Sequence, residues 1–445
     1  MDDNTFGLPR SLGDRLVLRW ATPQDSDSLV EFNFRIHNDN PNGRQELWLK
    51  DWTRALIGGE HPTVQAGDIT VVVDEAQQGQ IVSSAVLISQ VWSYDGVRFG
   101  CGRPELIATD EPYRRRGLVR AQMEALHAKS EARGELVQAI TGIPWYYRQF
   151  GYEMTVDLGG SRFLPVSKIK KLKNDQAEKY LIRRVKLEDM PILEKLYDRQ
   201  CAPSLLRCVR DEAIWRYEIT NAIDRDVPMR NRHMIETLDG QVAGYVEYVV
   251  FPKADRIRDI AVLDGQSMRE VCWFVARHLI EAAGPTDLET GKRTTGLSFN
   301  LGRSHPAYEA LDAELDEPRM PYAWYIRVPD LHAWIDHIDS LLEKRVRESV
   351  MAGYSGELRL NFYKSQLKLS FTNGLISDIG TYEPSTFFDG DAFFPGMTFL
   401  QLLFGSRSFD ELKFAYPDCF TDKNEPAVLL PILFPKHPSF ITMLS

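Results

Sequence analysis

A cluster of arginines beside a glycine is the segment of this sequence best suited to chemistry. Residues Arg114 to Arg120 read Arg-Arg-Arg-Gly-Leu-Val-Arg, and a run with helical character follows as far as Gly134. The first turn of a helix has free backbone N–H groups and the positive end of the helix dipole, so it can bind an anion. Gly117 lets that anion approach the backbone, and the arginines can add charged hydrogen bonds to a pyrophosphate or a ribose phosphate. An exposed arginine cluster without a ligand is the alternative interpretation.

The residues around this cluster predict the elements that would position it. Residues 103–120 have the pattern of a strand followed by the basic turn, the helical run continues to Gly134, and 136–141 has the pattern of another strand. Glycine commonly ends a helix because it adopts left-handed backbone angles. Strands and helices alternate through the first two thirds of the chain, which predicts an α/β architecture of mixed sheets flanked by helices.

Two motifs together resemble the signatures of the GNAT superfamily of acetyltransferases. The family's acetyl-CoA motif, Arg/Gln-x-x-Gly-x-Gly/Ala, matches Arg114 to Val119, except that Val119 replaces the final small residue. Trp145 to Tyr152, Trp-Tyr-Tyr-Arg-Gln-Phe-Gly-Tyr, is similar to the family's aromatic-Tyr-x-x-Phe-Gly-Tyr segment. The resemblance implies an N-acetyltransferase that moves an acetyl group from acetyl-CoA, as co-substrate, to a primary amine by direct attack in a ternary complex, with no metal.

The resemblance also implies roles for individual residues. Tyr147 would be the general acid that reprotonates the departing thiolate, because a phenol with a pKa of about 10 stays protonated at neutral pH. A core aromatic is the alternative interpretation of Tyr147. The strand before the turn would pair with pantetheine, the turn would hold the pyrophosphate, and the end of the next strand would border the acetyl arm. The implied cofactor-binding residues are Ile107, Ala108, Thr109, Arg115, Arg116, Gly117, Leu118, Val119, Arg120, Thr141 and Gly142.

Two segments of the chain begin in the same way, which indicates a duplicated domain. Arg19 and Arg183 each close a short apolar strand, and six residues later Asp25 and Asp189 each open an amphipathic helix. Similar Gly-Gln stretches, at 79–83 and 240–244, then precede an apolar strand in both segments.

The repeat and a change of pattern near Pro329 divide the chain into domains. Residues 1–162 would form the catalytic GNAT domain and 180–328 a degenerate GNAT-like copy, joined by a lysine-rich linker at 163–179. The equivalent turn of the second copy has Asp264 and no arginine cluster, and a carboxylate would repel a pyrophosphate. We therefore expect one acetyl-CoA site per chain.

The last segment, 329–445, combines helical and strand patterns and is predicted to be α+β. Apolar residues recur at helical spacing from Leu331 to Leu342, two alternating stretches around Tyr363 predict a hairpin, and 398–404 predicts a short buried helix. An alternative function is an apolar-ligand-binding protein with a vestigial or regulatory acetyl-CoA site. The residues that could line its cavity, or simply fill a core, are Phe362, Phe371, Phe399, Leu402 and Phe404.

The order of the parts resembles the enhanced intracellular survival protein family, which has an active GNAT domain, a degenerate GNAT domain and a sterol-carrier-like C-terminal domain. The resemblance implies homo-oligomers and a small-molecule or lysine amine as the acceptor. It also implies that the C-terminal carboxylate, here on Ser445, deprotonates that amine. The tail from Phe434 to Ser445 departs from the aromatic-acidic ending expected of the family, so this role stays open.

Composition argues against several other classes of protein. A net charge of −10 over 445 residues disfavours a general nucleic-acid-binding protein, which would need clustered basic residues. No apolar stretch has the length of a membrane span or of a signal peptide, and the cysteines are odd in number and scattered, as is typical of reduced thiols. We therefore expect a cytoplasmic protein with no nucleic-acid or membrane partner.

Overall fold

The chain divides into two compact units in the computed structural model, which describes residues 5–38, 47–173, 175–224, 231–249, 255–283, 295–439 and 441. The first unit consists of Met1–Val156, Ser204–Val209 and Ala323–Leu444. The second consists of Asp157–Pro203 and Arg210–Tyr322. Each unit therefore combines segments that are distant in the sequence.

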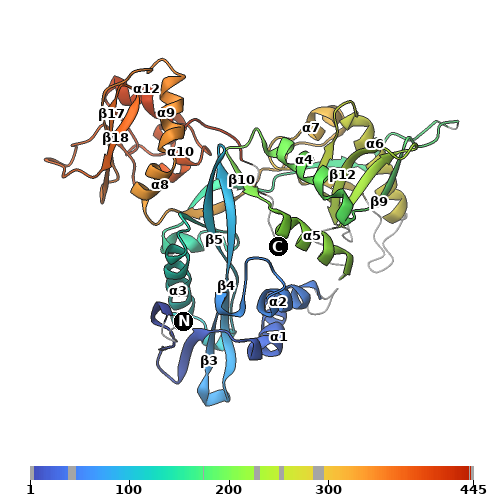
Figure 1. The fold of residues 1–445 in the computed structure, drawn as a ribbon, viewed down its shortest axis with the longest axis horizontal. Helices are drawn as coiled ribbons and strands as arrows, with labels where there is room; N and C mark the ends of the chain where they lie inside the picture. The colour runs from blue at the N-terminus through green and yellow to red at the C-terminus, as the bar shows by residue number, and fades with distance from the viewer. Residues whose placement is uncertain are drawn as a thin grey trace. The chain divides into compact units, whose positions relative to one another are not determined.

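A mixed sheet of nine described strands forms the larger part of the first unit (Figure 1). Its order is β1-β2-β3-β4-β5-β6-β15-β7, and β10 pairs with the distal end of β4. Neighbouring strands for which a register is given run antiparallel except β5 and β6, which run parallel. The strands are β1 Arg10–Ser11, β2 Leu16–Trp20, β3 Ile69–Asp74, β4 Gln80–Tyr94, β5 Val97–Thr109, β6 Val137–Ile140, β7 Glu153–Leu158, β10 Leu206–Val209 and β15 Tyr322–Arg327.

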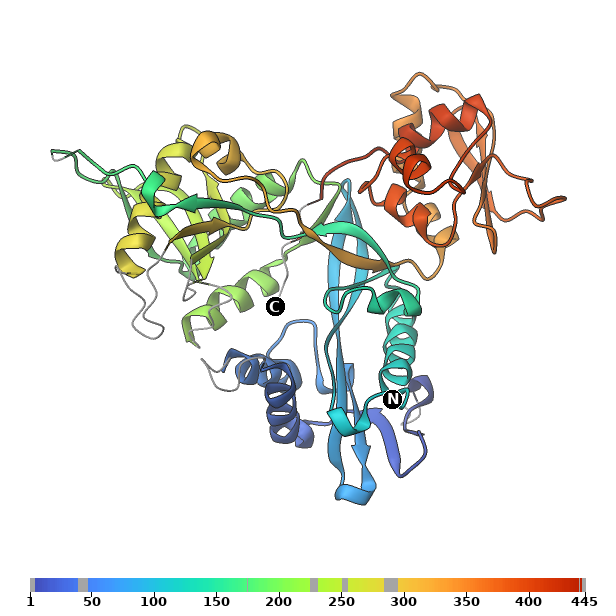
Figure 2. The same cartoon turned by 180° about the vertical axis from the view of Figure 1, so that it is seen from behind.

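Helices cover both faces of this sheet (Figures 1 and 2). Helices α1 (Ser26–His37) and α2 (Trp48–Gly58) bury Leu29 and Leu56 against one face, together with apolar residues of β3, β4 and β5. Helix α3 (Leu118–Ala132) buries Leu118 and Ala125 on the other face. Because successive side chains of a strand point to opposite faces, the apolar runs of β3 and β4 can supply both cores at once.

The second unit has its own six-stranded sheet and helices. The order of its strands is β8-β14-β13-β12-β11-β9, and β13 and β14 run parallel. Helix α6 packs an apolar face, including Trp273 and Leu279, into the core of this unit. The strands are β8 Arg162–Pro165, β9 Tyr180–Arg184, β11 Arg232–Thr237, β12 Val242–Val249, β13 Asp255–Val262 and β14 Gly296–Phe299, and the helices are α4 Met190–Cys201, α5 Glu212–Asp224, α6 Met268–Ala283 and α7 Pro306–Leu311.

A four-stranded sheet with helices forms the C-terminal part of the first unit. The predicted hairpin is confirmed, because β16 pairs with β17 across a turn in which the Phe362 N–H donates to the Ser365 carbonyl at 2.9 Å. The short buried helix is confirmed as α10, and the predicted helical face from Leu331 spans two helices that meet at Ile338. The elements are α8 Leu331–His337, α9 Asp339–Arg347, β16 Gly356–Asn361, β17 Gln366–Thr372, β18 Leu375–Gly380, β19 Ala392–Phe393, α10 Thr398–Leu403, α11 Phe409–Ala415 and α12 Asn424–Leu433.

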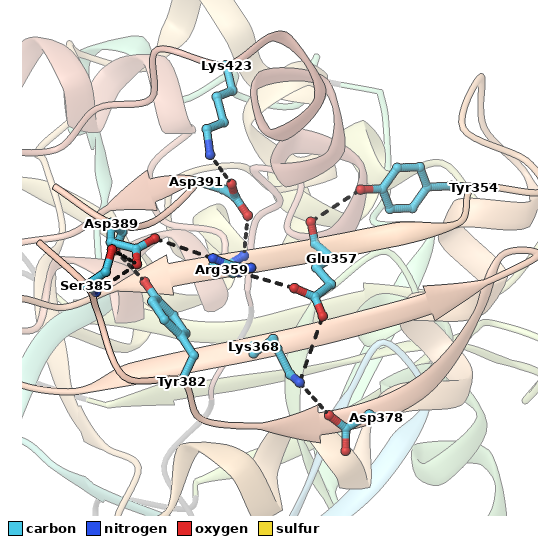
Figure 3. Close-up of polar contacts among 10 residues, drawn as sticks. All are labelled: Tyr354, Glu357, Arg359, Lys368, Asp378, Tyr382, Ser385, Asp389, Asp391 and Lys423. Carbon is cyan, nitrogen blue, oxygen red and sulfur yellow. Dashed lines mark hydrogen bonds and ion pairs between the residues drawn. The ribbon is translucent and has the colours of Figure 1, made fainter.

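The two faces of the C-terminal sheet differ in polarity. Leucines of β16 and β17, such as Leu358 and Leu369, are fully buried. The intervening residues form a network of ion pairs that runs across the strands and reaches the loop after β18 (Figure 3). Alternation of apolar and charged residues is the expected pattern for a sheet with one solvated face. The network is drawn in Figure 3 as Tyr354, Glu357, Arg359, Lys368, Asp378, Tyr382, Ser385, Asp389, Asp391 and Lys423.

The expected fold class, α/β mixed sheets flanked by helices followed by an α+β region, is confirmed. Three strands nevertheless pair outside the segment in which the sequence analysis placed them. Strand β8 belongs to the second sheet, whereas β10 and β15 belong to the first. Strand pairing depends on tertiary contacts, which a local sequence pattern does not contain. Within the described ranges, none of the helices combines the length and apolar character needed to cross a membrane.

Candidate active site

The arginine-rich turn leads directly into helix α3. Gly117 is the residue before the helix and has φ +79, a left-handed conformation, and the first helical bond runs from the Ala121 N–H to the Gly117 carbonyl at 3.1 Å. The N–H groups of Leu118, Val119 and Arg120 precede that bond and have no partner within the helix. A Cβ added at Gly117 would meet nothing within 4 Å. The backbone at Gly117, where the sequence predicts that an anion approaches, therefore has open space beside it.

Three of the four arginines of the turn have partners within the part of the chain that the structure describes. The pairs are Arg114 Nε with the Thr109 carbonyl, Arg116 with Asp14, and Arg120 with the Gln149 side chain. Arg115 is exposed, adopts a left-handed φ of +64, and contacts no partner among the described residues. A guanidinium that is free at a helix N-terminus can form charged hydrogen bonds with a phosphate.

Strand β5 has an irregular backbone just before the turn. Ser84 on β4 lies opposite Ala108, but Val86 lies opposite Glu105, so β5 has one extra residue at this point. Leu106 takes up this β-bulge with a left-handed φ of +47. A bulge leaves backbone groups outside the regular ladder and often lies next to a functional site. The predicted residues Ile107 and Ala108 follow the bulge immediately.

Strands β5 and β6 pair at only two positions, Cys101 with Val137 and Gly102 with Gln138. Beyond them, the edge of β5 from 103 to 109 has no strand partner among the described residues, although its other edge pairs with β4. Strand edges with free N–H and C=O groups can pair with an extended ligand. This edge of β5 at 103–109, which we call the parted edge because β5 and β6 separate there, is where the sequence predicts binding of the pantetheine arm.

Tyr147 lies in a short 3₁₀ helix, Tyr146–Phe150, that follows β6. Its side chain is buried, with 4% exposed, yet its hydroxyl forms no hydrogen bond to any of the described residues. Burial raises the pKa of Tyr147 well above its ordinary value, and the nearby Glu105 carboxylate raises it further. The phenol therefore stays protonated at neutral pH and has a proton available for donation.

Several predicted site residues meet around Tyr147. A Cβ at Gly142 would lie 3.6 Å from the Tyr147 hydroxyl, and Gly142 has φ +125, so the loop after β6, which also contains Thr141, passes next to the phenol. Ile107 and Val119 pack against the apolar cluster that contains Tyr147. Val119, the position that departs from the GNAT motif, thus contributes to packing behind the site. Ala108 and Leu118 point into other cores.

Two groups near Tyr147 were missed by the sequence analysis. Tyr325, in β15, packs its ring against Tyr147 with centroids 5.6 Å apart. Glu105 forms an ion pair with Arg103, in which Nη2 and Oε2 are 2.6 Å apart. The Arg103 guanidinium is buried and lies over the Trp324 ring, 5.2 Å from its centroid. Glu105 and Arg103 alternate with apolar residues, which is also the pattern of exposed strand residues, so the local sequence did not mark Glu105. Tyr325 lies on β15, which is distant in sequence, so the local sequence did not mark it either.

The predicted base, Ser445, lies outside the described residues. The preceding tail is bonded to the first unit, since the His437 N–H donates to Gly405 and the Leu205 N–H donates to Pro438. The base thus remains a prediction, whereas the predicted turn, strand edge and tyrosine can be placed in one unit.

Comparison with known proteins identifies one domain of the chain. Residues 50–155 match the family model of the acetyltransferase (GNAT) domain, and this range contains both the arginine-rich turn and Tyr147. No curated protein sequence matches the chain. The resemblance to the GNAT superfamily is therefore confirmed for this domain.

Solved structures resemble nearly the whole chain. A probable N-acyltransferase from Enterococcus faecalis V583 is 14% identical, with a TM-score of 0.67, 97% of this chain covered and 100% of that chain. A GCN5-related N-acetyltransferase from Kribbella flavida is 16% identical, with a TM-score of 0.65 and coverage of 97% and 99%. Eis1 from Mycobacterium abscessus is 14% identical, with a TM-score of 0.58 and coverage of 95% and 98%. At these identities the likeness establishes a shared fold.

Proposed function

We propose that this chain is an N-acetyltransferase that transfers the acetyl group of acetyl-CoA to a primary amine in a ternary complex. The GNAT domain and fold support acyl transfer in general. The observation that supports the proposal most directly is the combination of a helix N-terminus bearing Arg115 with the buried Tyr147, whose hydroxyl forms no hydrogen bond to any described residue. Both flank the parted edge of β5. The helix N-terminus with Arg115 suits the pyrophosphate of the co-substrate, and Tyr147 suits its acetyl thioester end.

The residues of the turn and of β5 would bind the co-substrate, which supplies the acetyl thioester. Arg115 and the first N–H groups of α3 have the charge and direction to hold a pyrophosphate. Backbone groups on the edge of 103–109 that faces away from β4 would pair with the amides of pantetheine. Thr141 and Gly142 would border the acetyl end, where Gly142 leaves room beside the Tyr147 hydroxyl.

Two protons must move during the reaction. As the C–N bond forms and the C–S bond breaks, the acceptor amine loses a proton to a base and the leaving sulfur gains one. Tyr147 would give its proton to the sulfur, and the carboxylate of Ser445 would take the proton of the amine. The described part of the tail is hydrogen-bonded to residues of the first unit at His437 and Ser439.

The acceptor is proposed to be an amine of a small molecule or of a lysine side chain. A net charge of −10 favours a cationic acceptor through long-range attraction. The further parts of the proposal are a degenerate second GNAT-like domain, a sterol-carrier-like C-terminal domain, homo-oligomers and a cytoplasmic location.

Release of free thiol from acetyl-CoA tests the proposed activity. The full chain should release thiol in the presence of at least one member of a panel of aminoglycosides, polyamines and lysine peptides, and mass spectrometry should detect an acetylated acceptor. Absence of turnover with every amine, together with stoichiometric binding of an apolar ligand, would establish the alternative function.

The packing of the C-terminal part does not favour that alternative. The rings of Phe362, Phe394 and Phe399 contact one another with centroids 5.1 to 6.3 Å apart, and Phe434 packs on Phe399. Rings at these separations fill space that an apolar ligand would need.

The role of Ser445 requires a separate test. A variant with several residues added after Ser445 moves the terminal carboxylate, so turnover should fall while the Kd of acetyl-CoA is unchanged. Equal turnover in the extended and native chains would eliminate the terminus as the base.

A further inference from the structure

We infer that Tyr325, on strand β15, is a positioning residue for Tyr147, so the site depends on a strand outside residues 50–155. The inference rests on the proposed function, in which Tyr147 donates a proton. Tyr325 does not need to touch substrate for this role. It acts on the turn that carries the acid.

The Tyr325 hydroxyl joins two backbone groups of the turn between β6 and Tyr147. It accepts a hydrogen bond from the Trp145 N–H and donates one to the Ile143 carbonyl at 3.4 Å. Trp145 has a left-handed φ of +66, a conformation that costs about 1 kcal/mol or more for a residue with a side chain. The hydroxyl therefore holds a turn that would otherwise relax, two residues before Tyr147.

The ring of Tyr325 also contacts the acid directly. It is fully buried and meets the Tyr147 ring edge to face, at an interplanar angle of 70°. Because the Tyr147 hydroxyl has no hydrogen-bond partner in the described part of the chain, the orientation of its ring depends on packing neighbours such as this one.

The register of β15 keeps Tyr325 in place. Tyr325 lies opposite Ile140 and Arg327 opposite Gln138, and the Arg327 guanidinium binds the Gln138 side chain at 2.5 Å and Glu131 on α3 at 2.8 Å. A slip of one residue would turn Tyr325 to the other face of the sheet and break these contacts. The strand is thus fixed on both sides of the tyrosine.

A double-mutant cycle in the full chain tests the inference. Tyr325→Phe keeps the ring and removes both bonds to the turn, so kcat should fall about ten-fold while the KM for acetyl-CoA stays within about two-fold. In the Tyr147→Phe background, Tyr325→Phe should cause no further loss, because the residue acts through Tyr147.

Tyr152→Phe is the matched control. Tyr152 is also fully buried beside Tyr147, with ring centroids 6.3 Å apart, but its hydroxyl bonds to His127 on α3 at 2.8 Å and not to the turn. The control should keep kcat within about two-fold of the native chain. Thermal melting of every variant verifies folding.

Three results would overturn the inference. One is an unchanged kcat in Tyr325→Phe, another is an equal loss in both backgrounds, and the third is the same loss in Tyr152→Phe. If Tyr147→Phe alone leaves kcat unchanged, the acid role itself fails, and the role of Tyr325 fails with it. A large effect of Tyr147→Phe with none from Tyr325→Phe rejects only the positioning role.

Discussion

The first and second sheets start with the same side-chain arrangement. In the first, the Arg19 guanidinium binds both carboxylate oxygens of Asp25, at 2.8 and 2.7 Å. In the second, Arg183 binds both oxygens of Asp189, at 2.7 and 2.8 Å. A 3₁₀ turn ending at the aspartate then leads into a helix in each case. This agreement supports the duplication that the sequence suggests.

The two sheets differ at the turn that follows the central strand pair. The turn before α3 has open space at Gly117 and bears Arg115, which has no partner among the described residues. Before α6, Arg199 binds the Asp264 side chain and also the Val262 carbonyl. The second turn therefore bears the carboxylate of Asp264, which is paired with an arginine from α4.

A tyrosine follows the parallel strand in both sheets, but its hydroxyl is used differently. The Tyr308 hydroxyl donates to the Phe299 carbonyl at 2.8 Å and accepts from the Leu301 N–H at 3.1 Å. The Tyr147 hydroxyl has no such bonds in the described part of the chain. The comparison teaches that the repeated framework can be kept while loops decide whether a tyrosine is structural or available for chemistry.

The largest expected difference between the regions is in catalysis. Tyr147→Phe should lower kcat about 100-fold because it removes the proton donor, with little change in the Kd of acetyl-CoA. Tyr308→Phe should leave kcat within about two-fold and lower the melting temperature, because its bonds hold a loop. Steady-state kinetics and thermal melts measure both. Equal losses of kcat would contradict the assigned difference.

Binding of acetyl-CoA gives the next largest contrast. Arg115→Ala should weaken the Kd about ten-fold through loss of a charged hydrogen bond to phosphate, with kcat almost unchanged. Arg199→Ala, the control in the second sheet, should not change the affinity. Calorimetric titration should also give one acetyl-CoA per chain, and a second site would refute the degenerate assignment.

The shared ion pairs should have smaller effects. Arg19→Ala should reduce the free energy of unfolding by about 1 kcal/mol, because its pair with Asp25 is bidentate and partly buried. Arg183→Ala should reduce it by more, because Arg183 binds Asp189 in the same way and also pairs with Glu236 at 2.8 Å. Hydrogen exchange can report each unit separately. A loss for only one pair would mean that the two arrangements are not equivalent.

These ion pairs also predict a dependence on pH. Burial by itself raises the pKa of Asp25 and Asp189. The hydrogen bond and charge of each arginine, together with a backbone hydrogen bond from Thr22 or Lys186, outweigh burial and lower the pKa of both. A carboxyl group with a lowered pKa in the folded state stabilises the folded protein at pH values above its pKa in the unfolded chain. This stabilisation is lost as the pH falls below about 4. Native and Arg→Ala chains should therefore converge in stability on acidification, and a constant difference would exclude the ion pair as the cause.

The smallest expected effect concerns kcat at alkaline pH, which should not change. Because burial raises the pKa of Tyr147, the tyrosine stays protonated and kcat should show no fall from its titration between pH 7 and about 10. A descending limb near pH 9 that disappears in Tyr147→Phe would contradict this environment. Circular dichroism at each pH controls for unfolding.

Much of the site could be predicted from local sequence. The arginine-rich turn does precede a helix, which begins at Leu118, and the aromatic segment does place Tyr147 after the next strand. These features follow from helix termini, glycine conformation and apolar periodicity, which act over a few residues. The bulge at Leu106 and the insertion of β15 had no such signal.

By itself, the sequence determined the alternation of strands and helices and the repeated Arg–Asp arrangement, and it predicted that the turn before α3 binds an anion. Only the tertiary structure decided that Tyr325 reaches a turn 180 residues earlier in the chain. It also decided that Arg115, alone among the arginines of the turn, has no partner within the described residues. Finally, it decided that the Tyr308 hydroxyl is hydrogen-bonded to the backbone, whereas the Tyr147 hydroxyl has no hydrogen bond within the described residues. The reason is physical. Propensity and periodicity are local, whereas the partner of a side chain depends on which distant strands the packed core brings together.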